Sequence, residues 1–134
     1  MLGALVKRAG VRALTAGGGE GALTILLTND KQLRALNLSF RGKDEATNVL
    51  SFPAVANNTH YLGDVAIAYG VTAREAKAAG KRMADHAAHL AAHGVLHLLG
   101  FDHQTARQAK AMEGLEAAIL AGLGIADPYA ARAA

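Results

Sequence analysis

The sequence predicts an α+β fold in which a small mixed β-sheet packs against helices and a buried central helix carries a set of histidines. Two observations lead to this prediction. Short apolar or β-branched runs alternate with longer stretches of helical periodicity, and one of those stretches is apolar on most sides apart from its histidines. No internal repeat or low-complexity linker divides the 134 residues, so we expect a single domain over residues 1–134.

The first part of the chain predicts two helices separated by a strand. Residues 2–14 have helical periodicity, and the glycine-rich residues 15–21 form a connection. Residues 22–28, ALTILLT, are apolar and β-branched enough for a buried strand. Asp30 can then cap a helix that we expect to extend to about Leu38.

Two more strands are predicted in the middle of the chain. Residues 47–53, TNVLSFP, form a strand that Pro53 ends, because proline cannot donate to a β-ladder. The polar residues 55–60, VANNTH, indicate a loop. Residues 62–69, LGDVAIAY, form the third strand.

The second half of the chain is predicted to be helical. Thr72 and Glu75 have the spacing of a capping box, and Gly80 interrupts the helix that they open. A second helix over residues 83–99 should lie buried at the centre of the fold, with its histidine face at a cleft. A last amphipathic helix spans residues 105–123.

The composition excludes several classes of protein. There are no cysteines, which excludes disulfides and thiolate metal ligands and is compatible with a cytoplasmic protein. Three basic residues interrupt the apolar N-terminal run, so it does not have the composition of a signal peptide. No apolar run approaches the roughly 20 residues of a membrane span. We therefore expect a soluble protein without a membrane partner.

Charge is distributed unevenly along the chain. Residues 1–82 contain 11 Lys or Arg against 6 Asp or Glu, whereas residues 83–134 contain 3 against 5. The first part is therefore the better candidate for contact with a polyanion. With three Phe, three Tyr and no Trp, the composition disfavours a base-stacking platform, so contacts to nucleic acid would depend on phosphates.

The run HGVLHLLGFDH, residues 93–103, has the spacing of a three-histidine metal site. His93 and His97 are one helical turn apart and project from the same face. Gly100 can end the helix, so that His103 folds back toward the same ion. Three neutral imidazoles leave a fourth position open, which is typical of a catalytic zinc ion, although nickel and copper also accept this ligand set.

Two features of this region limit the interpretation. His86 and His89 could pair with His93, but no helix break or returning ligand accompanies them, so we predict orienting or packing roles for both. The spacing is also that of metzincin proteases, in which a glutamate that acts as general base follows the first histidine. Gly94 occupies that position here, which disfavours peptide hydrolysis.

A second set of candidate residues lies in residues 40–53, FRGKDEATNVLSFP. Arg41 and Lys43 flank a glycine just before a predicted strand and could bind a substrate phosphate. The alternative is a solvated basic loop. Asp64 and Asp102 could orient a ligating imidazole, or they could be structural residues at a strand start and in a turn.

The segments RGKDEATNVLSFP, LGDVAIA and HGVLHLLGFDH occur in an order and at separations that resemble the YbeY family of bacterial rRNA maturation factors. The resemblance covers residues 22–124. It implies one zinc-type ion bound by His93, His97 and His103, with catalytic roles for Arg41 and His93. The ion would activate water or bind a phosphate oxygen, and Arg41 would stabilise the charge of the transition state.

The same resemblance implies a biological role. Members of the family are single-strand-specific, metal-dependent endoribonucleases in 16S rRNA 3′-end maturation and ribosome quality control. The implied partners are single-stranded RNA, the RNA of the small subunit, the ribosome and ribosomal proteins. Two alternatives remain open: a metal-dependent hydrolase of another bond, resembling a metalloprotease, and a non-catalytic ribosome-associated module with a structural ion. The family carries a further strand before the segment that matches residues 22–28, which leaves open how the sheet is completed.

Overall fold

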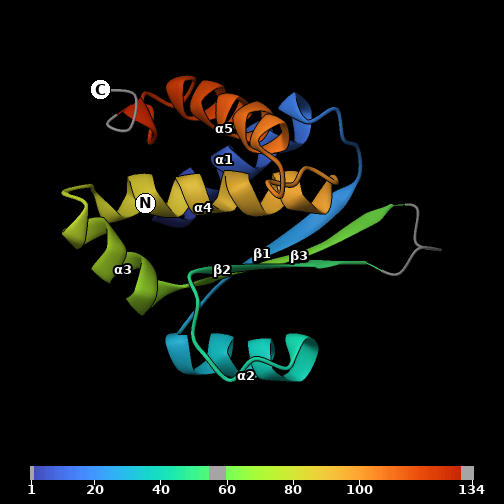
Figure 1. The fold of residues 1–134 in the computed structure, drawn as a ribbon, viewed down its shortest axis with the longest axis vertical. Helices are drawn as coiled ribbons and strands as arrows, with labels where there is room; N and C mark the ends of the chain where they lie inside the picture. Colours follow the sequence, from blue (N-terminus) through green and yellow to red (C-terminus); the bar gives the residue numbers. More distant parts are fainter. Residues whose placement is uncertain (1, 55–59, 131–134) are drawn as a thin grey trace.

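The computed structural model, shown in Figure 1, describes residues 2–54 and 60–130. Within these ranges the chain forms five helices and three strands, which confirms the predicted α+β class. In chain order the elements are α1 (Leu2–Ala16), β1 (Ala22–Thr28), α2 (Asp30–Arg41), β2 (Val49–Pro53), β3 (Tyr61–Ala68), α3 (Tyr69–Ala78), α4 (Met83–Leu98) and α5 (Ala106–Ala121). Most of the predicted loop over residues 55–60 lies outside the described residues.

The sheet is mixed, as predicted, and β3 is its central strand. The strand order is β1-β3-β2, with β3 parallel to β1 and antiparallel to β2. Because successive side chains of a strand point to opposite faces, β3 supplies two apolar clusters. Val65 and Ile67 belong to the larger cluster, whereas Ala66 and Ala68 belong to the smaller one.

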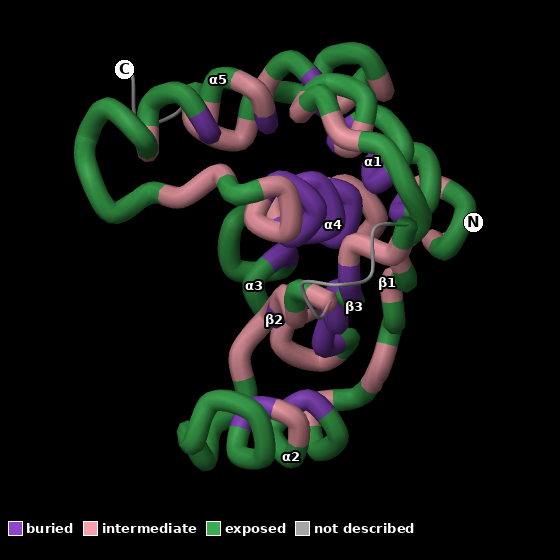
Figure 2. The backbone as a smooth tube through the Cα atoms, turned by 90° about the vertical axis from the view of Figure 1, so that its right-hand side faces the viewer, coloured by how far each residue is buried: buried purple, intermediate pink, exposed green. Residues whose placement is uncertain are grey.

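Helices cover both faces of the sheet. α4 lies along one face with α1 and α5 packed around it, and α2 lies on the opposite face (Figures 1 and 2). Figure 2 shows that α4 is buried along most of its length, between the sheet and the other helices. The prediction of a buried central helix is therefore confirmed.

Strand β1 differs from the prediction because it lies at an edge of the sheet. None of its residues is buried, and Leu26 and Leu27 are 45% and 37% exposed. Leu23 and Ile25 pack only partly against the larger apolar cluster. The prediction of a buried strand was therefore wrong. The sequence pattern could not reveal this, because an apolar run looks the same in a central strand and in an edge strand.

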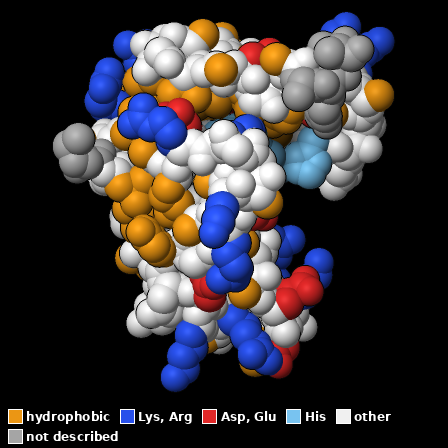
Figure 3. All heavy atoms as spheres, turned by 90° about the vertical axis from the view of Figure 1, so that its left-hand side faces the viewer, with side chains coloured by type: hydrophobic (Ala, Val, Ile, Leu, Met, Phe, Trp, Pro, Cys, Tyr) orange, Lys and Arg blue, Asp and Glu red, His pale blue; other side chains and the backbone are white. Residues whose placement is uncertain are grey.

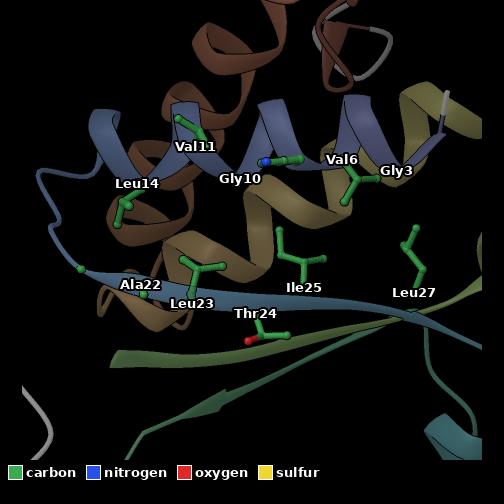
Figure 4. A pocket seen from close by; sticks show the side chains of 12 residues that line it. Gly3, Val6, Gly10, Val11, Leu14, Ala22, Leu23, Thr24, Ile25 and Leu27 are labelled. Atoms are coloured by element: carbon green, nitrogen blue, oxygen red, sulfur yellow. The ribbon is translucent and has the colours of Figure 1, made fainter. Parts of the chain in front are cut away.

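A groove of about 540 Å³ lies between α1 and β1 (Figure 4). Its lining is mostly apolar and includes Val6 and Leu14 from the helix and Leu23 from the strand. Helix and strand lie close together at Gly10, where a Cβ atom would lie 2.7 Å from Ile25 Cδ1. None of the lining residues is a histidine.

Helix α2 is capped one residue earlier than predicted. Asn29 has an extended backbone, and its side-chain oxygen accepts from the backbone N–H of Gln32 at 2.7 Å. Asp30 instead accepts from the N–H of Val71 and from Arg74, both at 3.0 Å, and so joins α2 to α3. The hydrogen bond from Val71 is the main cause that lowers the pKa of Asp30.

The C-terminal end of α2 also differs from the prediction. The helix continues to Arg41 rather than Leu38, and Gly42 ends it in the left-handed region at φ 70°. Glycine adopts this conformation without a steric penalty. Arg41 is consequently the last residue of a helix and does not lie in a loop.

The predicted capping box of α3 is wrong. Strand β3 continues directly into the helix, which begins at Tyr69 after Ala68, a residue without a side-chain cap. Thr72 lies inside the helix, and its hydroxyl donates to the carbonyl of Ala68 at 2.6 Å. Glu75 contacts His86 of the next helix at 2.9 Å.

Other predicted helix ends agree with the structure. Gly80 has a φ of 68° and separates α3 from α4. Thr105 caps α5 by accepting from the backbone N–H of Gln108, in a complete capping box. None of the described helices is long and apolar enough to cross a membrane.

Candidate metal centre

The structure brings His93, His97 and His103 together at the C-terminal end of α4. Each offers one ring nitrogen, and these three nitrogens all lie within 4.8 Å of one another. Nε2 of His93 is 3.1 Å from Nε2 of His97. The ring centroid of His103 is 5.5 Å from that of His93 and 5.1 Å from that of His97.

The return of the chain after α4 depends on Gly100, as the sequence predicted. This residue has a φ of 98°, and its N–H donates to the carbonyl of His97 at 3.0 Å. The N–H of Phe101 donates to the carbonyl of Leu96 at 3.0 Å, which reverses the chain direction. The reversal directs His103 back to the helix face that it has just left.

The cluster fits a zinc-type ion in its geometry and in its chemistry. Two ligands at about 2.0–2.1 Å from a tetrahedral ion lie roughly 3.3 Å from each other. The 3.1 Å between the two Nε2 atoms on α4 is close to that value. Among the described residues the cluster contains no fourth ligand, so a tetrahedral ion would keep one position for water or substrate.

The surroundings of His97 lower its pKa and so favour the neutral imidazole. Burial is the largest cause that lowers its pKa, and the neighbouring His93 and His103 lower it further. Asp102 and a backbone hydrogen bond act in the opposite direction without cancelling the shift. A neutral imidazole has a free lone pair, which is the form that binds a metal ion.

Glu116 of α5 is a candidate site residue that was not predicted from the sequence. Its side chain is 1% exposed. It accepts from His89 Nε2 at 2.5 Å, from His93 Nδ1 at 2.9 Å and from the hydroxyl of Tyr129 at 2.5 Å. Burial alone would raise its pKa, but these hydrogen bonds outweigh burial and lower the pKa to about 2.

This carboxylate fixes the tautomer of a candidate ligand. Because Glu116 is ionised at neutral pH, Nδ1 of His93 carries the proton that is donated to it. In the neutral form of His93, Nε2 is then the nitrogen with the free lone pair, and it faces the cluster. A carboxylate of this kind orients the imidazole and increases its basicity as a ligand. His89 shares the same carboxylate, in agreement with its predicted orienting role.

A sequence signal for Glu116 does exist. The buried stripe of α5 contains Met112, Ile119 and Leu120, and Glu116 occupies a position on the same stripe. An acidic residue at a buried position of an amphipathic helix requires a hydrogen-bonding partner inside the protein. The pattern therefore predicts an internal donor, although it does not identify His93 as that donor.

The structure explains why Gly94 follows the first histidine. A Cβ atom at this position would lie 2.5 Å from Val65 Cγ1 and 3.3 Å from Ser51 Oγ. The Ser51 hydroxyl also donates to the carbonyl of Gly94 at 2.9 Å. Helix α4 thus touches the sheet here, which leaves no space for the glutamate that a metzincin has at this position.

Arg41 and Lys43 lie on the α2 side of the sheet, and the histidines lie on the α4 side (Figure 1). Arg41 lines a cavity of about 680 Å³ between α2 and the sheet. Among the described residues no hydrogen bond or ion pair joins either side chain to the histidine cluster. Joint action of Arg41 and the cluster on one phosphate therefore stays a prediction.

The two aspartates have structural contacts. Asp64 accepts from the hydroxyl of Tyr61 and lines the α2-side cavity, so its described contacts do not include a ligating imidazole. Asp102 accepts from the backbone N–H of His103 at 2.8 Å and thereby stabilises the turn after α4. Of the two roles left open by the sequence, these contacts correspond to the structural one.

Fold and site together define a small α+β protein whose buried helix presents a three-histidine cluster suited to a metal ion. A family profile described as Endoribonuclease YbeY matches residues 6–124. The chain belongs to this family.

Similar proteins agree with this assignment. An Endoribonuclease YbeY of Alkalilimnicola ehrlichii is 54% identical over an alignment of 124 residues, and the match covers 87% of this chain and 75% of that protein. One from Rhodopseudomonas palustris strain HaA2 is 51% identical over 84% of this chain. The chain spans 63% of the length of that relative and 65% of the one from strain CGA009.

A solved structure has the same fold. The solution structure of TM1509 from Thermotoga maritima matches with a TM-score of 0.63 over 90% of this chain and 85% of that chain. Its sequence is 19% identical, so this likeness concerns the fold alone.

Proposed function

We propose that the protein is a metal-dependent endoribonuclease that cleaves single-stranded RNA with an ion held by His93, His97 and His103. The observation that carries the proposal is the histidine cluster with one open ligand position, in a chain that belongs to a family named for endoribonucleases. Zinc is the proposed ion, and nickel and copper accept the same ligands.

Each residue of the site has a proposed task. A bound ion supplies a Lewis acid that stabilises negative charge on phosphoryl oxygens and makes water more acidic. His93 and His97 hold the ion from α4, and Glu116 keeps His93 in the ligating tautomer. Arg41 binds the RNA phosphate and stabilises the charge that develops when water displaces a ribose oxygen from phosphorus. Lys43 adds a second cation near that phosphate.

The proposed biological setting follows from the family resemblance. It comprises maturation of the 16S rRNA 3′ end and ribosome quality control in the cytoplasm. The proposed partners are the small-subunit rRNA, the ribosome and ribosomal proteins. The excess of Lys and Arg in residues 1–82 supports a contact with RNA, because cations neutralise phosphates and release counterions.

The test combines elemental analysis with cleavage of a labelled single-stranded RNA, with and without chelator. We expect His97→Ala to lose both the metal and cleavage. Arg41→Ala should keep the metal, and its cleavage rate should fall by a factor of roughly 100–1,000. This is the usual effect of removing one group that stabilises transition-state charge.

Lys31→Ala, which removes another exposed cation from α2, serves as the control and should keep both properties. Metal-free protein that cuts as fast as the loaded protein would refute the proposal. Full cleavage by Arg41→Ala would refute the role of Arg41.

A further inference from the structure

The cavity on the α2 side of the sheet has the size and lining of a ligand pocket. Its volume of about 680 Å³ lies within the range of roughly 300–1,000 Å³ that is usual for small-molecule sites. α2 contributes Leu36 and Phe40 to its lining, and the strands contribute Leu26, Phe52 and Ala66. Most of the lining is therefore apolar.

Two phenylalanines meet in this cavity. The ring centroids of Phe40 and Phe52 are 5.2 Å apart, and the rings are tilted by 60°. Phe40 is 69% exposed, and Leu26 beside it in the cavity is 45% exposed. The sequence composition disfavoured a base-stacking platform, but the fold brings two of the three phenylalanines together. Because Phe40 is largely exposed, this pair offers an aromatic surface to a flat ring.

Charge around the cavity favours a ligand with an uncharged ring and an anionic group. Arg41 lines the cavity, and neither Arg41 nor Lys43 has an ion-pair partner among the described residues. The nearby Asp44 is already paired with Arg34 at 2.7 Å. Because Asp64 in the lining repels anions, an anionic group is favoured at Arg41, and an uncharged ring is favoured in the rest of the cavity. Figure 3 shows Lys and Arg side chains, with some acidic ones between them, at the end where α2 lies, and further Lys and Arg side chains at the opposite end.

One edge strand connects this cavity with the histidine cluster. Ser51 of β2 lines the cavity, and its hydroxyl donates to the carbonyl of Gly94, the neighbour of His93. β2 is an edge strand, so an extended chain can cross it from one face of the sheet to the other. The edge of the cavity is thus one strand away from the residue that follows His93.

We infer that the cavity binds one unstacked base of single-stranded RNA against Phe40 and Phe52, while Arg41 binds the adjoining phosphate. The inference rests on the proposed function, because it names the part of the substrate that this side of the site holds. Base stacking on aromatic rings tolerates every base, since each base has a π-face. The cavity therefore accepts any unpaired base, whereas a base in a duplex is stacked and paired and cannot enter it.

The test measures binding by the full chain to a fluorescent single-stranded RNA and to a matched oligonucleotide that lacks bases. Fluorescence anisotropy reports both affinities, with chelator present to keep the RNA intact and again with zinc-loaded protein. Phe40→Ala should weaken binding of the RNA about tenfold, within the roughly 5- to 150-fold that one stacked base contributes, and leave binding of the base-free oligonucleotide unchanged. Arg41→Ala should weaken both.

Two variants control for loss of folding. Leu38→Ala removes a side chain that is 50% exposed on the same helix but does not line the cavity, and should bind like the wild type. Phe40→Tyr keeps the ring and should retain the preference for RNA over the base-free oligonucleotide.

If Phe40→Ala lost the same factor of affinity for the RNA and for the base-free oligonucleotide, the inference would be overturned. Unchanged affinity for both would also overturn it. Self-association that buries Phe40, detected as a mass increase by light scattering and accompanied by no base-dependent binding, would also overturn it. RNA cleavage without base-dependent binding contradicts this inference alone. Base-dependent binding without cleavage contradicts only the proposed function.

Discussion

At the residue scale, the site depends on one buried carboxylate. Glu116 is ionised inside the protein because three donors, from His89, His93 and Tyr129, compensate for its loss of hydration. Only 1% of its surface is exposed, so water cannot readily replace a lost donor. The orientation of the His93 ring is therefore coupled to the packing of α5 on α4.

Replacing this carboxylate by an amide tests that coupling. Glu116→Gln keeps the volume of the side chain but removes the negative charge that holds the proton on Nδ1 of His93. We expect zinc affinity to fall by a factor of roughly 10–100, as is usual when an orienting partner of a ligand is lost. Competition with a chromophoric chelator measures this change.

Glu113→Gln, three residues earlier on α5, is the matched control and should leave zinc affinity unchanged. An unchanged affinity in Glu116→Gln would mean that His93 adopts the ligating orientation without the carboxylate. Circular dichroism of the metal-free variants separates a weaker site from a loss of folding.

At the scale of elements, features set by a single run of sequence could be predicted, whereas contacts between separate helices and strands could not. The spacing of His93 and His97 and the break at Gly100 are local properties of the chain, and the structure agrees with them. The edge position of β1 depends on which strands pair with it, and no periodicity within residues 22–28 reports that. The contact of Glu116 with His93 likewise requires α5 to pack on α4.

The contact of α4 with β3 makes a prediction about Gly94. Alanine favours a helix over glycine by about 1 kcal/mol, but a Cβ here would meet the buried side chain of Val65 at 2.5 Å. Val65 is β-branched and confined to few rotamers, so overpacking should outweigh the gain. We expect Gly94→Ala to lower the free energy of unfolding by about 1–2 kcal/mol.

Gly114→Ala on α5 provides the comparison, because a Cβ there would have no atom within 4 Å. This substitution should raise the free energy of unfolding by about 0.5–1 kcal/mol. Urea denaturation of the two variants measures both effects. Stabilisation by both substitutions would show that α4 shifts easily away from the sheet.

At the scale of the whole molecule, the sheet separates the two halves of the candidate site. The histidine half follows from a single run of sequence, residues 93–103, so it could be predicted with all three members. The position of Arg41 could not, because it depends on α2 covering the face opposite α4 (Figure 1). The sequence also gave no indication that Phe40 and Phe52, twelve positions apart in the chain, would share one cavity.

The three histidines also link the metal site to global stability. His93 and His97 belong to α4, which packs against the sheet and three other helices, and His103 lies on the connection to α5. The unfolded chain cannot hold the three imidazoles in this arrangement, so an ion binds the folded state selectively. Free zinc at 100 times its dissociation constant should add about 2.7 kcal/mol to the free energy of unfolding.

For a chain of this length, that stabilisation corresponds to a rise in Tm of roughly 8–13 °C. Differential scanning calorimetry with zinc and with excess chelator measures the shift. His97→Ala removes one of the three candidate ligands and should show no shift between the two conditions. An equal shift in that variant would mean that the ion binds elsewhere on the protein, and the histidine cluster would then no longer support the proposed metal centre.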